Sequence, residues 1–237
     1  MMPSDPAILN ADAEGRFRIL QVADFHSDVS EAMNERTRAD VTAMIARLQP
    51  HLLAVLGDIW CGDEHPDAAP MWRRRDLDFL GGLGVPWAFV WGNHDYIGHF
   101  EAAQSEIATT PNAVLPTGDG RGSYRIELRM PGDAAARWDC FFLNSGAEWQ
   151  MPDDLRWFQE ENRRLIAARG ESTPAICFFH IPLRNYQEAL DQGRTVGVGT
   201  EEVLFWGDEA GLGAAIIEGA GNVRACFCAH SHENDFH

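Results

Sequence analysis

The sequence contains no lysine, and all 19 of its basic side chains are arginines. Chemistry that needs a lysine, such as a Schiff base or a phosphate-binding P-loop lysine, is therefore excluded. The arginines stand against 36 acidic residues and leave a net charge of −17. So acidic a protein is a poor candidate for a general nucleic-acid binder, which needs a basic face. It can still act on phosphates if bound metal ions reverse the local charge.

Long apolar runs and a secretion signal are also missing. No run approaches the roughly 18 to 20 residues of a membrane-spanning helix, and residues 1–14 lack a cationic segment followed by an apolar one. The cysteines are odd in number and lie mostly in apolar runs, where cysteine is usually a small core residue. They are Cys61, Cys140, Cys177, Cys226 and Cys228. We therefore expect a cytoplasmic protein in a reducing compartment, without a membrane partner.

The length and patterning indicate one α/β domain. With 237 residues and no low-complexity linker, the chain suits a single core. We expect an N-terminal tail over residues 1–15 and one domain over 16–237. Apolar periodicity predicts helices at 35–48, 71–80, 155–168 and 212–218, and strands at 17–23, 52–56, 86–91, 122–128, 138–143, 175–179 and 223–229. The alternation in the first half predicts parallel strands, whereas the turn between 122–128 and 138–143 predicts a hairpin and hence a mixed sheet.

Five short polar clusters each follow one of the apolar stretches. They are Asp24-Phe25-His26, Gly57-Asp58, Gly92-Asn93-His94-Asp95, His180 and His230-Ser231-His232. A metal ligand at the end of a buried strand is held rigidly and still faces a crevice. A single Gly-Asp pair or a lone histidine is more often structural than functional. Together they supply two aspartates, one asparagine and four histidines, which is enough for two divalent ions that share a carboxylate.

The spacing suggests how the ligands divide between two ions. Asp24 and His26, two residues apart at a strand end, project to the same side and can hold one ion. Asp58, at the end of a second strand, can bridge both ions. The remaining ligands complete the set, with Asn93, His180 and His230 on the second ion and His232 on the first.

Such a pair of ions favours phosphoryl chemistry. Two ions about 3.5 to 4 Å apart can clamp phosphoryl oxygens and lower the pKa of a water between them, so that hydroxide is available near neutral pH. His94 is not a predicted ligand, and it is the natural candidate for the proton donor to the leaving oxygen. Asp95 either orients His94 or caps the following helix, and the sequence does not separate these two roles.

The order of these blocks resembles the calcineurin-like metallophosphoesterase superfamily, whose signature is D-x-H, G-D, G-N-H-[D/E], a lone H and G-H-x-H. The resemblance spans residues 24–232. It implies a four-layer α/β/β/α sandwich of two mixed sheets flanked by helices, and metal-dependent hydrolysis of a phosphate ester. It also implies Asp24, His26, Asp58 and His232 on one metal, and Asp58, Asn93, His180 and His230 on the other. The identity of the two ions stays open among Mn, Fe, Zn, Co and Ni.

The stretches at 180–183 and 232–236 further resemble a cytosolic branch labelled purple-acid-phosphatase-like. Two residues depart from the patterns of these families. Ala229 replaces the glycine of the last block, and Cys61 stands where true purple acid phosphatases place an iron-binding tyrosine. The redox metal site of the purple enzymes is therefore not expected. Related proteins usually continue into further strands, so we expect a chain ending at His237 to be a shortened form.

Three functions remain open at this stage. A phosphomonoesterase is favoured, a phosphodiesterase uses the same ions, and a non-catalytic scaffold should have lost ligands or His94, which are all present. We expect the glycine-rich, loop-like residues 184–211 to form a rim or flap over the pocket, with Arg184 or Arg194 either at the substrate phosphate or in solvent. Trp60 and Trp91 are candidates for pocket walls.

Overall fold

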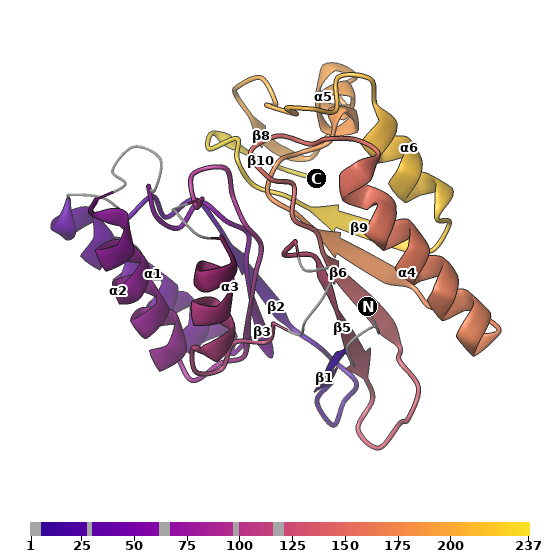
Figure 1. Cartoon of the computed structure of the whole chain (residues 1–237), viewed down its shortest axis with the longest axis horizontal. Coiled ribbons are helices and arrows are strands. Elements are labelled where there is room, and N and C mark those ends of the chain that lie inside the picture. The colour runs from indigo at the N-terminus through magenta and orange to yellow at the C-terminus, as the bar shows by residue number, and fades with distance from the viewer. Residues whose placement is uncertain (1–5, 28–29, 62–66, 97–99, 116–120) are drawn as a thin grey trace.

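One side of the molecule is a parallel sheet covered by three helices (Figure 1). The computed structural model describes residues 6–27, 30–61, 67–96, 100–115 and 121–237. The sheet has the order β2-β3-β4, with β2 at Ile19–Val22, β3 at Leu52–Val55 and β4 at Trp87–Phe89. Its outer face packs against α1 (Glu31–Leu48), α2 (Ala69–Gly82) and α3 (Phe100–Thr109). Every residue of β3 is buried because both faces of the strand are covered.

The other side is a five-stranded mixed sheet in the order β1-β5-β6-β7-β9. Only the β5–β6 pair is antiparallel among the described strands of this sheet. The strands are β1 (Ala7–Asn10), β5 (Tyr124–Arg129), β6 (Trp138–Phe142), β7 (Ala175–Phe178) and β9 (Val223–Phe227). Helices α4 (Asp153–Arg169) and α6 (Leu212–Gly219) pack on its outer face.

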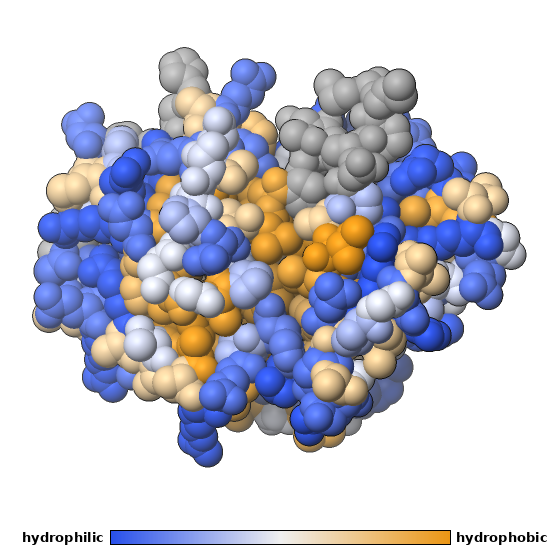
Figure 2. Space-filling model, turned by 90° about the horizontal axis from the view of Figure 1, so that it is seen from below, coloured by the Kyte–Doolittle hydropathy of each residue, from blue (hydrophilic) through white to orange (hydrophobic). Residues whose placement is uncertain are grey.

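The two sheets pack face to face and complete the four layers. Leu52 and Ala54 of β3 lie in one apolar cluster with Ile126 of β5 and Cys140 of β6. The alternate β3 residue Leu53 points the other way, into the cluster beneath the helices. This arrangement confirms the expected α/β/β/α sandwich, although the described strands of the smaller sheet are all parallel. Seen from below, apolar residues gather in the middle of the surface between largely hydrophilic flanks (Figure 2).

Two parts of the chain contain more regular structure than expected. Residues 7–10 are not part of a tail, because β1 pairs in parallel with β5 from Ala7 to Asn10. A strand of four residues, two half-buried and two exposed, is too short for its periodicity to be visible in the sequence. The predicted loop 184–211 begins with α5 (Arg184–Asp191) and contains β8 (Gly197–Gly199), which pairs with β10 (Asn234–Phe236).

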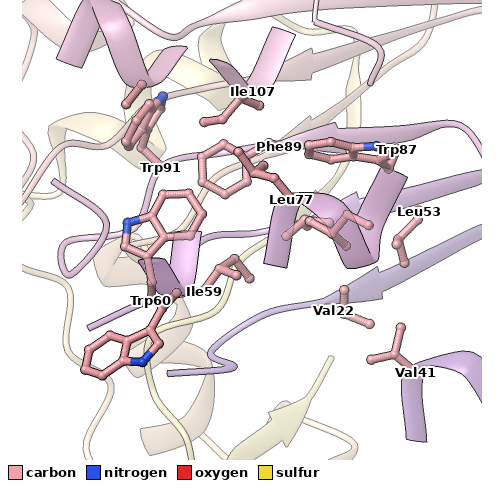
Figure 3. Close-up of a cluster of buried hydrophobic side chains, with 14 of the residues drawn as sticks. Val22, Val41, Leu53, Ile59, Trp60, Leu77, Trp87, Phe89, Trp91 and Ile107 are labelled. Atoms are coloured by element: carbon pink, nitrogen blue, oxygen red, sulfur yellow. The ribbon is translucent and has the colours of Figure 1, made fainter. Parts of the chain in front are cut away.

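Trp60 and Trp91, which the sequence made candidates for pocket walls, are buried core residues. Their exposed fractions are 0% and 1%. Both rings pack on Phe89, with centroids 5.7 Å away for Trp60 and 5.4 Å away for Trp91 (Figure 3). They anchor the segments that follow β3 and β4 instead of lining a cavity. No helix among the described residues has both the length and the apolar character that crossing a bilayer requires.

Asp76 is a buried carboxyl on α2 that contacts the segment after β2. It is 1% exposed, with Oδ1 3.4 Å from a guanidinium nitrogen of Arg38 on α1, and it interacts with the side chain of Ser27. Burial raises the pKa of Asp76 to about 6, against the opposing effects of Ser27 and Arg38. The folded protein therefore binds this proton more tightly than the unfolded chain does.

We expect Asp76 to make stability depend on pH between about pH 4 and pH 6. Below this window the carboxyl is protonated in both states. As the pH rises, the unfolded state ionises first, so a destabilisation of about 2 to 3 kcal/mol develops and is complete above about pH 6. The free energy of unfolding, measured in urea for the wild type and Asp76→Asn, should show this as a pH-dependent difference. A difference that stays constant over the window would contradict the assignment.

Candidate metal centre

The five polar clusters converge at one edge of the sandwich, at the carboxyl ends of β2, β3, β4, β7 and β9. The segments after β2 and β3 run side by side, since Asp24 N donates to the Gly57 carbonyl at 2.9 Å and His26 N to that of Asp58 at 3.0 Å. The last cluster joins them from the other sheet, where His230 N donates to Asp24 Oδ2 at 3.3 Å. The sandwich therefore brings together residues 206 positions apart.

One group of predicted ligands comprises Asp24, His26 and His232, whose donor atoms lie within 4.8 Å of one another. The Nε2 atoms of His26 and His232 are 3.1 Å apart. Asp24 Oδ1 lies 3.5 Å from Nε2 of His232 and 3.9 Å from Nε2 of His26. These distances match the expectation that the three side chains can hold one ion.

A second group comprises Asp58, His180 and His230. His180 Nε2 lies 3.1 Å from Asp58 Oδ2 and 3.1 Å from Asn93 Oδ1. The other ring nitrogen, Nδ1, is 2.7 Å from the Leu56 carbonyl and can donate its proton there. In the neutral imidazole this leaves Nε2 with a free lone pair, directed at oxygen atoms. Asn93 thus lies with the group to which the sequence assigns it.

Asp58 lies between the two groups. Its Oδ2 atom is 3.1 Å from His180 Nε2 of the second group and 3.8 Å from His26 Nε2 of the first. The side chain is 1% exposed. One carboxylate oxygen is therefore placed to serve both groups, as the sequence predicts for a bridging ligand.

Three buried atoms of these groups have no hydrogen-bond partner among the described residues: Asp24 Oδ1, Asp58 Oδ2 and His230 Nε2. Buried polar atoms are rarely left unsatisfied in folded proteins. Burial, with a smaller contribution from His180, lowers the pKa of His230 to about 4, so its imidazole is neutral near pH 7 and able to bind a metal. Divalent cations bound here would satisfy all three atoms at once, so the chemistry of these residues fits a pair of metal ions.

The backbone at the ligands is strained. Asp24, His26, Asp58 and His230 have φ angles of 55°, 46°, 53° and 74°. This left-handed region costs about 1 to 3 kcal/mol for a residue other than glycine, and such strain tends to collect at functional sites. Here the unusual conformations turn the ligands out of the strand direction and toward one another.

The approach of the segments after β3 and β4 requires a glycine at position 92. A Cβ atom there would overlap both the carboxylate and the backbone nitrogen of Asp58. Gly57 has a φ of 86°, and a Cβ atom at this position would overlap the backbone of Gly92. The glycines of the Gly57-Asp58 and Gly92-Asn93 clusters therefore let the two ligand segments touch.

Gly92→Ala should displace Asp58 and lower the affinity for Mn²⁺ by about 10- to 100-fold, the range typical of lost ligand support. Gly82→Ala is the matched control, because a Cβ at that helical position meets nothing within 4 Å. The control should leave metal binding unchanged. Calorimetric titration with Mn²⁺ measures both variants, and equal affinities would show that the contact at Gly92 is not needed.

Asp95 supports the segment that carries Asp58. It is fully buried, and its carboxylate accepts hydrogen bonds from the backbone N–H groups of Asp58, Ile59 and Gly92 at 2.8, 2.9 and 2.8 Å. Burial, together with the charge of Asp58, raises the pKa of Asp95 to about 7. These contacts give Asp95 a positioning role, and a direct part in catalysis stays a prediction.

His94 lies at the candidate metal centre. Its backbone N–H donates to Asp58 Oδ1 at 2.9 Å, and its ring centroid is 5.2 Å from that of His26. A ring nitrogen of His94 also lies within 4.8 Å of donor atoms of His26 and Asp58. The side chain can therefore reach either a substrate or an ion, and its role as proton donor stays a prediction.

The two departures from the family patterns leave the ligands in place. Ala229 does not adopt a positive φ, so its backbone does not demand glycine. Cys61 is buried, and its Sγ atom lies 3.5 Å from His26 Nδ1. It therefore contacts the ring nitrogen of His26 that is not Nε2, the atom near Asp24 and His232. Arg184, a candidate for binding phosphate, is instead paired with Glu188 at 3.0 Å and with the Glu209 carbonyl.

Trp206 is a residue at the centre that sequence reasoning did not single out. Its ring meets the His230 ring edge-on, with centroids 4.4 Å apart. It lies within the segment expected to form a rim, but no motif surrounds it. The available signal was a tryptophan beside glycine in a polar, glycine-rich stretch.

Comparison with known proteins places the chain in a family. A profile of the calcineurin-like phosphoesterase family matches residues 17–234. The protein named probable inactive purple acid phosphatase 28 of Arabidopsis thaliana is 29% identical, over 94% of this chain and 67% of that protein. Phosphatase DCR2 of Saccharomyces cerevisiae is 25% identical, over 94% of this chain and 45% of that protein.

The fold also has a solved counterpart. A dimetal phosphatase from Danio rerio superposes with a TM-score of 0.62 at 13% identity, covering 91% of this chain and 82% of that chain. At this identity the likeness concerns the fold alone. Because the family profile spans every strand end that carries a predicted ligand, the chain belongs to the calcineurin-like phosphoesterase family.

Proposed function

We propose that the protein hydrolyses phosphate monoesters with two divalent metal ions. The observation that carries the proposal is the position of Asp58, whose Oδ2 lies 3.1 Å from His180 Nε2 and 3.8 Å from His26 Nε2. A single carboxylate between two sets of histidines is the arrangement that a shared pair of ions needs. The match to the calcineurin-like phosphoesterase family and the relative named as a phosphatase support the same chemistry.

In this proposal, seven side chains bind the metal ions and His94 donates a proton. Asp24, His26, Asp58 and His232 would hold the first ion, and Asp58, Asn93, His180 and His230 would hold the second. When bound, the ions supply positive charge to the phosphoryl oxygens and acidify a water near neutral pH. His94 gives a proton to the departing ester oxygen, and Asp95 fixes the backbone that presents Asp58.

The ions also explain how so acidic a protein accepts an anionic substrate. The net charge of −17 repels a phosphate ester at long range. Divalent cations at the strand ends reverse the local sign, so binding and metal loading are coupled. All five cysteines are free, which supports our proposal of a reducing, cytoplasmic location.

A non-catalytic role is the rival proposal, because relatives carry the words "probable inactive" in their names. In this chain the predicted ligands and His94 are present and converge, which favours an active enzyme. A phosphodiesterase uses the same ions and differs only in the surrounding pocket.

The test is hydrolysis of mono- and bis-para-nitrophenyl phosphate by protein loaded with Mn²⁺, with chelator-treated protein as control. We expect turnover of the monoester, loss of turnover on chelation and slower hydrolysis of the diester. Faster hydrolysis of the diester would identify a phosphodiesterase. If neither ester is hydrolysed by protein that holds its ions, the scaffold is the correct alternative.

A further inference from the structure

Trp206 combines exposure with a rigid mounting. The side chain is 41% exposed, although it is among the largest apolar groups in the chain. Its carbonyl accepts a hydrogen bond from Trp149 N at 3.0 Å. The next residue, Gly207, has a φ of 84°, and a Cβ there would overlap the backbone of Trp149. The segment is thus locked against the core while the indole ring faces outward.

Trp206 contacts both the candidate metal centre and a cavity. It contacts His230, with ring centroids 4.4 Å apart. Trp206 also lines a cavity of about 530 Å³, together with Tyr96, Asn144 and Arg121. Tyr96 directly follows Asp95, so the cavity opens beside the segment that also carries His94.

The walls of this cavity are tied to one another through Asn144. Its Oδ1 accepts a hydrogen bond from the Tyr96 hydroxyl at 2.9 Å, and its Nδ2 donates to the Arg121 carbonyl at 2.6 Å. The backbone N–H of Asn144 donates to Ser123 Oγ at 3.0 Å. Burial raises the pKa of Tyr96 to about 12, so its ring is a neutral wall. Segments from both sheets therefore form a preorganised pocket.

We propose that this pocket receives the leaving group of the phosphate ester and that Trp206 selects a leaving group with a flat ring, such as an aryl or nucleoside group. The inference rests on the proposed function for the position of the phosphoryl group. An exposed, immobilised indole offers a large apolar face at low entropic cost, which is how aromatic residues gain affinity at recognition sites. A small alkyl group leaves that face uncovered.

Binding of phosphonates, which carry no cleavable ester bond, tests the pocket without turnover. Protein loaded with Mn²⁺ should bind phenylphosphonate about 10-fold more tightly than methylphosphonate in calorimetry, the range expected for stacking on an aromatic ring. Trp206→Phe should keep most of this preference. Trp206→Leu, which keeps bulk against His230 but lacks a flat ring, should lose it without loss of bound Mn²⁺. Equal preferences in the wild type and the Leu variant overturn the proposal.

Kinetics separate this inference from the proposed function. With phenyl phosphate and glycerol phosphate as substrates, Trp206→Leu should raise KM for the phenyl ester by about 10-fold and change that for glycerol phosphate little. Phe227→Ala is the control, because Phe227 is 42% exposed and lies on β9, outside this cavity. If the wild type prefers phenylphosphonate but hydrolyses neither ester, the proposed hydrolysis is wrong and the proposed pocket stands. If the wild type hydrolyses both esters and Trp206→Leu loses activity equally on both, the proposed hydrolysis stands. Trp206 then supports His230 and does not select the leaving group.

Discussion

Asp58→Asn should abolish nearly all ester hydrolysis and weaken metal binding at both positions. The carboxylate is 1% exposed and lies within 4 Å of histidines from both ligand groups. An amide keeps the shape of the side chain but removes the negative charge that two cations share. Losing several kcal/mol of this stabilisation corresponds to a fall in kcat of about 10³-fold or more.

Hydrolysis of para-nitrophenyl phosphate and the Mn²⁺ content of each variant measure this effect. Asp78→Asn is the matched control, since that carboxyl is 68% exposed on α2. The control should behave like the wild type. If Asp58→Asn keeps both full activity and the full metal content, Asp58 does not bridge the ions and the assignment of the two groups must change.

His94→Ala should produce a loss of activity that depends on the leaving group. General acid catalysis is typically worth about 10²- to 10⁴-fold. An alkoxide leaves poorly without a proton, whereas nitrophenolate departs readily as an anion. The variant should therefore lose much of its kcat on alkyl phosphates and far less on nitrophenyl phosphate, with its Mn²⁺ content unchanged.

The metal content is the essential control for His94, because its ring can also reach an ion. Loss of Mn²⁺ from His94→Ala would make it a ligand. An equal loss of rate on both types of ester, with metal retained, would mean that His94 positions the phosphate. Asp95→Asn extends the comparison. If Asp95 acts only through the backbone of Asp58, this variant should lower the rate on both types of ester alike.

The arrangement of the ligands could be predicted from sequence because the order of apolar strand and polar cluster repeats along the chain. Parallel strands end at the same edge of a sheet, so Asp24 and Asp58 had to meet once β2 and β3 were recognised. The longer helices were visible for a similar reason. The predicted helix 35–48 forms the body of α1, which begins at Glu31. Apolar periodicity is strong over several turns and weak over a few residues.

The missed features depend on contacts distant in sequence. β1 has four residues and is defined by its pairing with β5, more than 100 positions later. The exposure of Trp206 depends on the packing of Gly207 against Trp149, and no local pattern records it. Trp60 and Trp91 adjoin ligands in sequence, yet their side chains point into the core. The polar clusters therefore predicted which residues lie together at the strand ends, whereas sequence proximity to a cluster did not predict a pocket wall.

Elemental analysis of the protein saturated with Mn²⁺ tests the central claim most directly. Two groups of ligands that share Asp58 predict about two equivalents of metal per chain. The wild type should reach this value, and Asp58→Asn should fall well below it while Asp78→Asn retains it. A wild-type stoichiometry that saturates at about one equivalent would contradict the two-metal centre, whatever activity the protein shows.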